Sequence, residues 1–333
     1  MGVARYAVWR LVQAVPVLFG VVTVTFLLAN AIPGDPVQTM LGPSPSQAQV
    51  ESIRAKYGLD QPLWRRYATY LGDVARGDLG RSIYFETPVR AKIAERFPET
   101  MLLMLSSYLF AVVVAVPLGV LSAKRRNEPA DHAARVVSLV GVSTPSFWIG
   151  LVLILLFVFE LGWFPSTDLV LPWADPASVA GASTRVDVLG TALSHLVLPV
   201  VALGTLQMAA ITRIERSEML DVLSQDYVTL ARAYGVRERT ILRKHAFRNA
   251  QLPVITVVGL QIASAIGGAI LVEAVFSING MGTLILTAIY NLDYPLIMGT
   301  TLVFSLFFLV GVILTDITYA YVDPRVSYGA REV

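Results

Sequence analysis

The chain has 333 residues, of which 55% are hydrophobic and only 15% are charged, whereas soluble domains carry about 25% charged residues. The net charge of +2 is too small to indicate a nucleic-acid partner, and the absence of cysteine excludes disulfide bonds, thiolate metal sites and a cysteine nucleophile. The composition therefore indicates a membrane protein.

Six stretches without Asp, Glu, Lys or Arg are long enough to cross a bilayer, which takes about 20 apolar residues. They predict an all-α integral membrane protein with six transmembrane helices. The stretches are residues 11–32, 101–123, 136–159, 188–212, 249–272 and 296–315. In the first stretch Ala29-Asn30-Ala31 is similar to a signal-peptidase site, but the stretch exceeds the length of a secretory h-region. We therefore expect an uncleaved span.

Basic residues predict the orientation, because cytoplasmic loops carry an excess of Lys and Arg. A cytoplasmic N-terminus places Lys124, Arg125, Arg126 and Arg135 inside, together with the eight basic residues from Arg213 to Arg248. The segment between the first two spans also contains basic residues, but loops of that length cross the membrane largely regardless of charge. With six spans, both termini are expected in the cytoplasm.

These spans divide the chain into four predicted regions. Residues 1–32 form the N-terminal segment and first transmembrane helix, and residues 33–99 form an extracytoplasmic region. Residues 100–320 form a core with transmembrane helices 2–6, which includes a cytoplasmic loop at 213–250. Residues 321–333 form a cytoplasmic tail.

The extracytoplasmic region is expected to contain two short helices after the Pro33-Gly34-Asp35-Pro36 turn. Ser46 is a candidate N-cap for a helix over 49–57, which Gly58 would end. The apolar spacing over 63–74 predicts a second, amphipathic helix. These elements indicate a small cap on the outer face.

The cytoplasmic loop has an apolar pattern at steps of three and four, which predicts one amphipathic helix over 220–234. The apolar positions are Leu220, Leu223, Tyr227, Leu230 and Tyr234. Gly235 is expected to end this helix in a left-handed conformation. A second helical stretch is expected over 237–249, and Pro253 then falls near the first turn of span five, where proline is tolerated.

The sequence predicts no catalytic and no metal-ligating residue. It has no Gly-Lys dipeptide and hence no phosphate-binding P-loop, no paired His-Glu motif and no Gly-x-Ser-x-Gly motif. The one ionisable residue within the spans is His195, which is more simply a hydrogen-bonded packing residue than a proton relay. A pore that lacks a nucleotide-binding site favours a subunit that is driven by a separate ATPase. This chain itself is expected to bind no cofactor.

Several motifs along nearly the whole chain are similar to one known family. They are Pro33-Gly34-Asp35-Pro36, Gly77-Asp78-Leu79-Gly80-Arg81-Ser82, Ser143-Thr144-Pro145-Ser146-Phe147-Trp148-Ile149-Gly150, Ala231-Arg232-Ala233-Tyr234-Gly235 and Asn249-Ala250-Gln251-Leu252-Pro253. In these motifs the chain resembles the membrane permease subunits of bacterial ABC importers for dipeptides and oligopeptides.

The chain departs from the general importer pattern at two places. Leu230 or Ala231 stands where the general importer consensus has Glu. The spacing from the loop glycine to the following proline, 18 residues from Gly235 to Pro253, is longer than in that consensus and resembles the peptide branch of the family. Asn279 stands before Gly280 where relatives usually have Pro. Since Asn-Gly also forms a tight turn, this difference leaves the predicted function unchanged.

The resemblance implies that the loop at 213–250 contains a coupling helix that docks into a groove on the ATPase. The residues implied in coupling are Glu218, Leu220, Leu223, Asp226, Tyr227, Ala231, Arg232, Ala233 and Gly235. It further implies a second homologous permease, two cytoplasmic ATPases that hold ATP and magnesium, an extracytoplasmic solute-binding protein and surrounding lipid. The alternative for this loop is a helix lying on the membrane surface, but such helices favour a Lys- and Arg-rich polar face.

Two further sets of candidate residues come from the spans and their ends. Ser143, Pro145, Gln261, Ser264 and Gly268 are candidates for lining the pathway, and Pro145 is expected to kink the third span. Ordinary helix packing is the alternative for this set. Glu273, Asp293 and Tyr294 are candidates for contact with the binding protein, with solvated loop charges as the alternative.

The function predicted from the sequence is a permease that forms half of a peptide pathway across the cytoplasmic membrane. An importer of the same class for nickel complexes, glutathione or haem is the first alternative. A membrane enzyme or ion-coupled carrier is a remote one, since it would need buried catalytic or ionisable groups.

Overall fold

The structure is a computed structural model that describes residues 3–32, 34, 37, 41 and 45–322; the side chains of residues 3–8, 252, 260, 262–265 and 316–322 lie outside the description. The described chain is helical, with one isolated antiparallel bridge between Arg81 and Pro88. It divides into two compact units. Unit 1 comprises Met1–Trp9, Met101–Ile278 and Val310–Val333, and unit 2 comprises Arg10–Thr100 and Asn279–Leu309.

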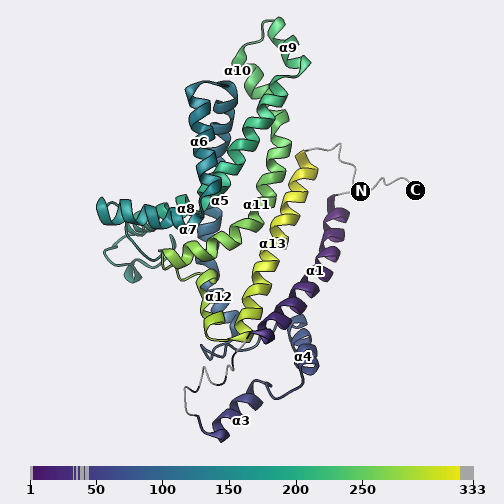
Figure 1. Cartoon of the computed structure of the whole chain (residues 1–333), viewed down its shortest axis with the longest axis vertical. Coiled ribbons are helices and arrows are strands. Elements are labelled where there is room, and N and C mark those ends of the chain that lie inside the picture. Colours follow the sequence, from purple (N-terminus) through teal and green to yellow (C-terminus); the bar gives the residue numbers. More distant parts are fainter. Residues whose placement is uncertain (1–2, 33, 35–36, 38–40, 42–44, 323–333) are drawn as a thin grey trace, which may run out of the picture. The chain divides into compact units, whose positions relative to one another are not determined.

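The long helices correspond to the predicted spans. They are α1 (Val3–Ala31), α5 (Val89–Lys124), α8 (Arg185–Leu223), α11 (Arg248–Val275) and α13 (Tyr294–Val322) (Figure 1). Among the described residues, four stretches are long and apolar enough to cross a membrane, namely Trp9–Ala31, Val89–Lys124, Arg185–Leu223 and Tyr294–Thr315. A bent pair of helices makes a fifth if the pair forms one span, and the count of six spans remains a prediction.

The third predicted span is not one continuous helix. Helix α6 (Pro129–Ser143) and the pair α7 (Ser146–Leu153) and η1 (Ile154–Glu160) meet at a bend of 107° (Figure 1). Pro145 lacks an N–H group and pushes the preceding residue out of the helical region, and Thr144 has φ −104° and ψ 126°. The kink predicted at Pro145 is therefore confirmed, and it takes the form of a break between α6 and α7.

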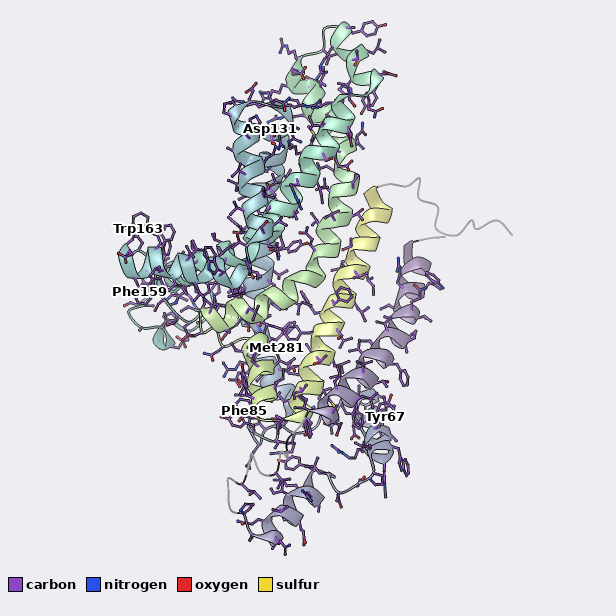
Figure 2. All side chains as sticks on the ribbon, in the orientation of Figure 1. Tyr67, Phe85, Asp131, Phe159, Trp163 and Met281 are labelled. Atoms are coloured by element: carbon purple, nitrogen blue, oxygen red, sulfur yellow. The ribbon has the colours of Figure 1, made fainter. Side chains whose placement is uncertain are left out.

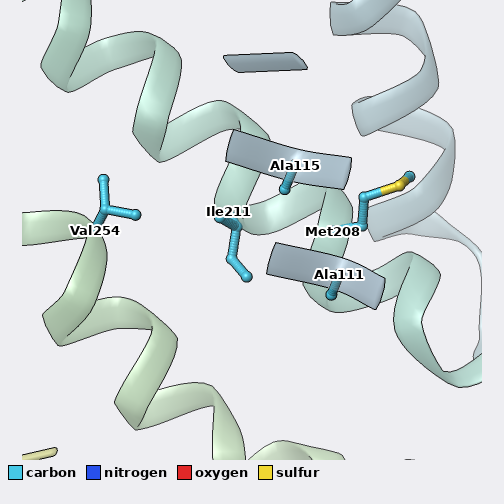
Figure 3. Close-up of a cluster of buried hydrophobic side chains, with 5 residues drawn as sticks. All are labelled: Ala111, Ala115, Met208, Ile211 and Val254. Carbon is cyan, nitrogen blue, oxygen red and sulfur yellow. The ribbon is translucent and has the colours of Figure 1, made fainter. Parts of the chain in front are cut away.

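The core of unit 1 lies where α5, α8 and α11 meet. Ala111 and Ala115 of α5, Met208 and Ile211 of α8 and Val254 of α11 form one buried cluster (Figure 3). Helix α6 packs closely against α8, because a Cβ atom at Gly141 would lie only 2.9 Å from the Cβ atom of Ala209. Small residues thus bring these helices together, as is common in membrane bundles.

Unit 2 contains the two short helices expected after the first span, α3 (Gln47–Lys56) and α4 (Leu63–Ala75). The predicted cap is confirmed, since Ser46 and Gln49 form a reciprocal capping box. Gly58 follows α3 with φ +63°, as expected for a residue that ends a helix. Helix α4 packs on α1, where the ring of Tyr67 lies 5.2 Å from that of Phe26 (Figure 2).

A second part of unit 2 is built from α12 (Met281–Tyr290) and the turn before α5. The hydroxyl group of Thr100 accepts a hydrogen bond from the backbone N–H of Met281 at 2.8 Å. Asp293 is fully buried and accepts hydrogen bonds from the Ser82 hydroxyl group at 2.5 Å and the Tyr84 N–H at 3.0 Å. These bonds tie the start of α13 to the turn at 82–85.

Large apolar side chains are exposed in long runs on the described helices. Examples are Val12, Val15 and Leu28 on α1, Leu105, Leu109 and Val113 on α5, and Val136, Leu139 and Val140 on α6. A soluble monomer rarely exposes such contiguous apolar surface. A hydrocarbon environment explains it, in agreement with the membrane class predicted from composition.

Candidate coupling site

The predicted coupling helix is divided into two helices. Helix α8 ends at Leu223 and α9 spans Asp226–Ala233, so the expectation of one helix over 220–234 is wrong. The Ser224 hydroxyl group donates to the carbonyl oxygen of Asp221, and Gln225 is extended with ψ 148°. Serine side chains that bond the nearby backbone compete with helix continuation, which explains the break.

Because of this break, the predicted apolar stripe separates into two parts. Leu220 and Leu223 are half-buried and pack against a cluster of Ala123, Met219, Leu242, Ala246 and Ala250. Tyr227, Leu230 and Tyr234 are 42%, 56% and 80% exposed. Of the five apolar side chains of the stripe, these three are therefore exposed, and we call them the α9 surface.

A side chain that the sequence analysis did not single out anchors α9. Val228 is fully buried, whereas most other residues of α9 are exposed. The amide of Asn249 donates to the Tyr227 hydroxyl group at 3.0 Å, which adds a link to the start of α11. Helix α9 is thus held on one side and open on the other.

The turn after α9 has the predicted glycine geometry. Gly235 has φ +76°, and a Cβ atom there would meet no atom within 4 Å. The left-handed conformation, and not a close contact, therefore accounts for glycine at this position. The short helix α10 (Glu238–Thr240) and the π-helical turn η3 (Ile241–Phe247) follow and lead into α11, in agreement with the helical stretch expected over 237–249.

An ion pair spans this turn. Arg232 donates to Glu238 through Nε at 3.2 Å and through NH2 at 2.9 Å. These hydrogen bonds hold the pKa of the Glu238 carboxyl group below its usual value, so the pair is charged at neutral pH. The two side chains also line an open cavity of about 270 Å³ with Lys124, Arg126 and Leu242.

Two buried carboxylates, one on α6 and one on α8, support the start of the loop. The first is Asp131 of α6, which is fully buried (Figure 2). It accepts hydrogen bonds from Arg216 at 2.6 and 2.8 Å, from the Ser122 hydroxyl group at 2.5 Å and from the Asn127 N–H at 2.9 Å. Sequence reasoning missed this pair because 85 residues separate its members.

The second buried polar group is the carboxylate of Glu215. Gln251 donates to its two oxygens at 3.0 and 2.9 Å. Gln251 belongs to the motif Asn249–Pro253, which the sequence analysis had quoted without assigning a contact to it. The two ends of the loop are therefore joined within unit 1.

The remaining predicted coupling residues are placed as follows. Glu218 is half-buried on α8, Asp226 is exposed in the first turn of α9, Ala231 is half-buried, and Ala233 is exposed. Their docking to a partner remains a prediction.

The candidates for lining the pathway come partly together. Ser143 and Pro145 are exposed at the break between α6 and α7. A Cβ atom at Gly268 would lie 3.4 Å from the Ser146 hydroxyl oxygen, so α11 passes close to α7 there. Gln261 is half-buried, and the side chain of Ser264 lies outside the described residues. Lining of a pathway by these residues remains a prediction.

The candidates for contact with a binding protein are not exposed charges. Glu273 and Asp293 are fully buried and Tyr294 is 7% exposed. Asp293 instead accepts hydrogen bonds from the turn at 82–85, as described above. The alternative of solvated loop charges is equally at odds with this burial, and a contact with a partner would require rearrangement at these positions.

His195 has the contact expected of a packing residue. Its Nδ1 atom lies 3.0 Å from the carbonyl oxygen of Thr167, a hydrogen-bond distance. Both residues belong to unit 1, and the bond ties α8 to the segment that precedes it.

Taken together, these features define an integral membrane protein of apolar helices with a helical loop on which three apolar side chains are exposed. The chain is similar to "Oligopeptide transport system permease protein AppB" of Bacillus subtilis, with 41% identity over 98% of this chain and 100% of that protein. It is also similar to "Dipeptide transport system permease protein DppB" of Alkalihalophilus pseudofirmus (38% identity, 97% and 99% coverage). A third relative is "Glutathione transport system permease protein GsiC" of Escherichia coli (36% identity, 97% and 99% coverage).

A family model described as "Binding-protein-dependent transport system inner membrane component" matches residues 115–328, and the corresponding N-terminal model matches residues 3–104. The chain belongs to this family. It is therefore a multi-pass protein of the cytoplasmic membrane and a component of a transport system, and not itself a catalyst.

Proposed function

We propose that the chain is a permease subunit that forms half of the pathway of an ATP-driven importer for dipeptides and oligopeptides. The names of the similar oligopeptide and dipeptide permeases, at 38–41% identity over nearly the full length, support a peptide substrate. One relative is a glutathione permease, so glutathione, which is itself a small peptide, is the second candidate for the substrate.

The observation that carries this proposal in the structure is the α9 surface. Tyr227, Leu230 and Tyr234 are exposed on a helix that Val228 and the Gly235 turn hold in place. Aromatic and aliphatic side chains of this kind anchor protein interfaces. We assign this surface to docking with a cytoplasmic ATPase, which supplies the ATP and magnesium that this chain does not bind.

The full assembly in this proposal has a second homologous permease, two ATPases and an extracytoplasmic solute-binding protein. ATP-driven movement of the ATPases displaces α9, and the long helices then switch access between the two faces of the membrane. Substrate selection lies mainly in the binding protein. In this proposal the chain has six spans, and both termini and the loop at 213–250 lie in the cytoplasm, as the basic residues favour.

The docking role is tested by comparing two leucine variants in the reconstituted assembly. Leu230→Asp places a charge on the exposed α9 surface, so it is expected to lower ATPase retention and peptide uptake with normal membrane abundance. Leu223→Asp places a charge against the buried cluster, so it is expected to lower the abundance of the folded chain. Normal ATPase retention by Leu230→Asp would contradict the docking role.

Three further measurements test the rest of the proposal. A single cysteine at position 238 should react with impermeant reagents only from the cytoplasmic side, and labelling from outside intact cells would contradict the orientation. Uptake of labelled dipeptides, oligopeptides, glutathione, nickel complexes and haem by the reconstituted assembly should select peptides. The purified chain alone should show no ATPase activity, since it lacks a P-loop.

A further inference from the structure

Unit 2 contains an open cavity that none of the predicted sites uses. It has a volume of about 350 Å³ and lies among the end of α3, the inner face of α4, the turn at 78–80 and the first turn of α13. Its size is within the range of about 300–1,000 Å³ that small-molecule sites occupy. Its walls combine apolar side chains such as Phe26 and Met298 with charged ones of both signs.

One of the two cations that line this cavity has no carboxylate partner among the described residues. Arg66 of α4 is half-buried, and its side chain makes no hydrogen bond or ion pair with the described residues; the one group that acts on it electrostatically is the Tyr294 phenol. Burial lowers the pKa of its guanidinium group, although arginine keeps its charge in proteins. A desolvated cation without an anion is costly, and an anionic ligand would relieve that cost.

A second polar group in the same cavity is also unsatisfied. The hydroxyl group of Tyr57 is buried and has no hydrogen-bond partner among the described residues. Buried hydroxyl groups nearly always have a partner, so this hydroxyl group is a donor that a ligand can use. Lys56 lies beside it, with Nζ 5.4 Å from the centre of the Tyr57 ring.

The opposite charge is supplied by two carboxylates that also line the cavity, Asp73 and Asp78. Asp73 has only a long contact of 3.9 Å with the exposed Arg76, and Asp78 accepts from the Gly80 N–H at 2.9 Å. Both therefore retain acceptor capacity. A cavity with a free guanidinium group, a free hydroxyl donor and two carboxylates is complementary to a small molecule with one negative and one positive end.

We propose that this cavity binds a short zwitterionic peptide, whose terminal carboxylate lies at Arg66 and Tyr57 and whose terminal ammonium group lies at Asp73 and Asp78. This inference rests on the proposed function, because it gives the permease its own contact with the peptide in addition to the contacts of the binding protein. The two charged ends fix orientation, and the mixed walls between them leave the side chains of the peptide unspecified. The site thus favours free termini over particular side chains.

The test uses the purified full chain in lipid nanodiscs, without a binding protein, and L-alanyl-L-alanine as the probe in ligand-observed NMR. Dialanine is expected to bind, and its C-terminal amide and its N-acetyl form are each expected to bind about tenfold more weakly or worse, since each loses a charge-assisted hydrogen bond. Acetate probes the carboxylate alone and is expected to bind more weakly than dialanine. Equal binding of dialanine and acetate would reduce the site to one for simple anions and overturn the proposal.

Variants separate the cavity from the rest of the chain. Arg66→Met should abolish the difference between dialanine and its amide, whereas Arg65→Met, which alters an exposed neighbour outside the cavity, should preserve it. Tyr57→Phe removes only the unpartnered hydroxyl group, so the fold is retained and dialanine binding should fall. Unchanged dialanine binding in both Arg66→Met and Tyr57→Phe would overturn the proposal.

A failure here is distinguishable from a failure of the proposed function. If dialanine does not bind the cavity but the reconstituted assembly still takes up peptides, only the inference about the cavity is wrong. If the assembly takes up no peptide at all, the proposed function is wrong.

Discussion

A Cβ atom at position 119 would lie 2.5 Å from the Cβ atom of Glu215, so Gly119 of α5 and Glu215 of α8 determine how closely these two helices approach. The backbone of α8 is also near, since the same Cβ atom would lie 3.0 Å from the carbonyl oxygen of Thr212. Glu215 in turn accepts two hydrogen bonds from Gln251 of α11. One glycine thus permits a contact that joins three helices.

Gly119→Val should therefore destabilise unit 1. Overpacking of a buried contact costs about 1–3 kcal/mol, and the displaced Glu215 would lose its bonds to Gln251 as well. The expected result is a lower midpoint of thermal unfolding in detergent. The matched control is Gly190→Ala, at an exposed helical glycine where a Cβ atom meets nothing within 4 Å; it should be neutral or slightly stabilising. Equal midpoints for the two variants would contradict the contact.

The buried pair of Asp131 and Arg216 should be strongly coupled. Asp131 is fully buried and Arg216 is 21% exposed, so either single change, Asp131→Asn or Arg216→Gln, leaves a poorly solvated partner. We expect each to cost about 2–3 kcal/mol, somewhat below the cost for fully buried pairs, and the double variant to cost less than the sum. Unfolding by denaturant in a double-mutant cycle measures this coupling.

The exposed pair of Arg125 and Glu128 provides the comparison for that cycle. Its atoms are 4.0 Å apart and the side chains are 54% and 59% exposed. Exposed pairs contribute about 0–1 kcal/mol, so Arg125→Gln and Glu128→Gln should show almost no coupling. Similar coupling in the two cycles would mean that burial does not strengthen the Asp131 pair.

The left-handed conformation of Gly235 predicts a graded series of variants. Gly235→Asn should retain ATPase binding best, because asparagine tolerates positive φ, whereas Gly235→Val should lose it through a strain of about 1–2 kcal/mol or more in the turn. Co-purification of the ATPases and uptake in vesicles measure the series. Gly181→Val is the control, since Gly181 also has positive φ and open space but lies in another loop, and it should leave ATPase binding unchanged.

The ion pair across this turn determines the expected effect of Glu238→Gln. An isolated surface charge contributes about 0–1 kcal/mol, so its removal would be almost harmless. In the structure Glu238 pairs with Arg232 at two distances, 3.2 and 2.9 Å, and each side chain remains about half exposed. A modest loss of ATPase retention is now expected from Glu238→Gln, which makes it unsuitable as a neutral control.

Asp293 should stabilise the turn at 82–85 within unit 2. Asp293→Ala removes the acceptor for the Ser82 hydroxyl group and for the N–H groups of Tyr84 and Leu296. Each buried donor left without a partner costs about 1–3 kcal/mol. Limited proteolysis should then cut near Tyr84 faster than in the parent protein. Asp175→Ala, which alters an exposed cap of the short helix η2 (Pro176–Ser178), should leave the rate unchanged.

The sequence predicts those features that depend on a few adjacent residues. The cap at Ser46, the break at Pro145 and the positive φ of Gly235 all follow from local backbone chemistry, and the structure has each of them. Hydropathy likewise predicts the long apolar helices, because the bilayer imposes a minimum length.

Features that depend on burial could not be predicted in this way. Periodicity places Leu223 and Leu230 on one apolar stripe, but it does not distinguish a face packed on its own core from a face left open for a partner. Asp293 follows an apolar helix and resembles a surface charge in the sequence. Its carboxylate instead accepts hydrogen bonds from Ser82 and Tyr84, which lie 211 and 209 residues earlier in the chain. Such contacts carry no local signal.

The 107° break at Pro145 also has a consequence for the order in which the protein assembles. A Cβ atom at Gly150 of α7 would lie 3.0 Å from the ring of Phe276 and 3.7 Å from Ala202, so α7 packs on residues that are synthesised later. At about 5–20 residues per second, Phe276 leaves the ribosome roughly 6–25 seconds after α7 is complete. Until then the hydrophobic segment after Pro145 is without its packing partners in α8 and α11. Early in biogenesis the apolar surface of this segment must therefore be covered by lipid or by an insertase.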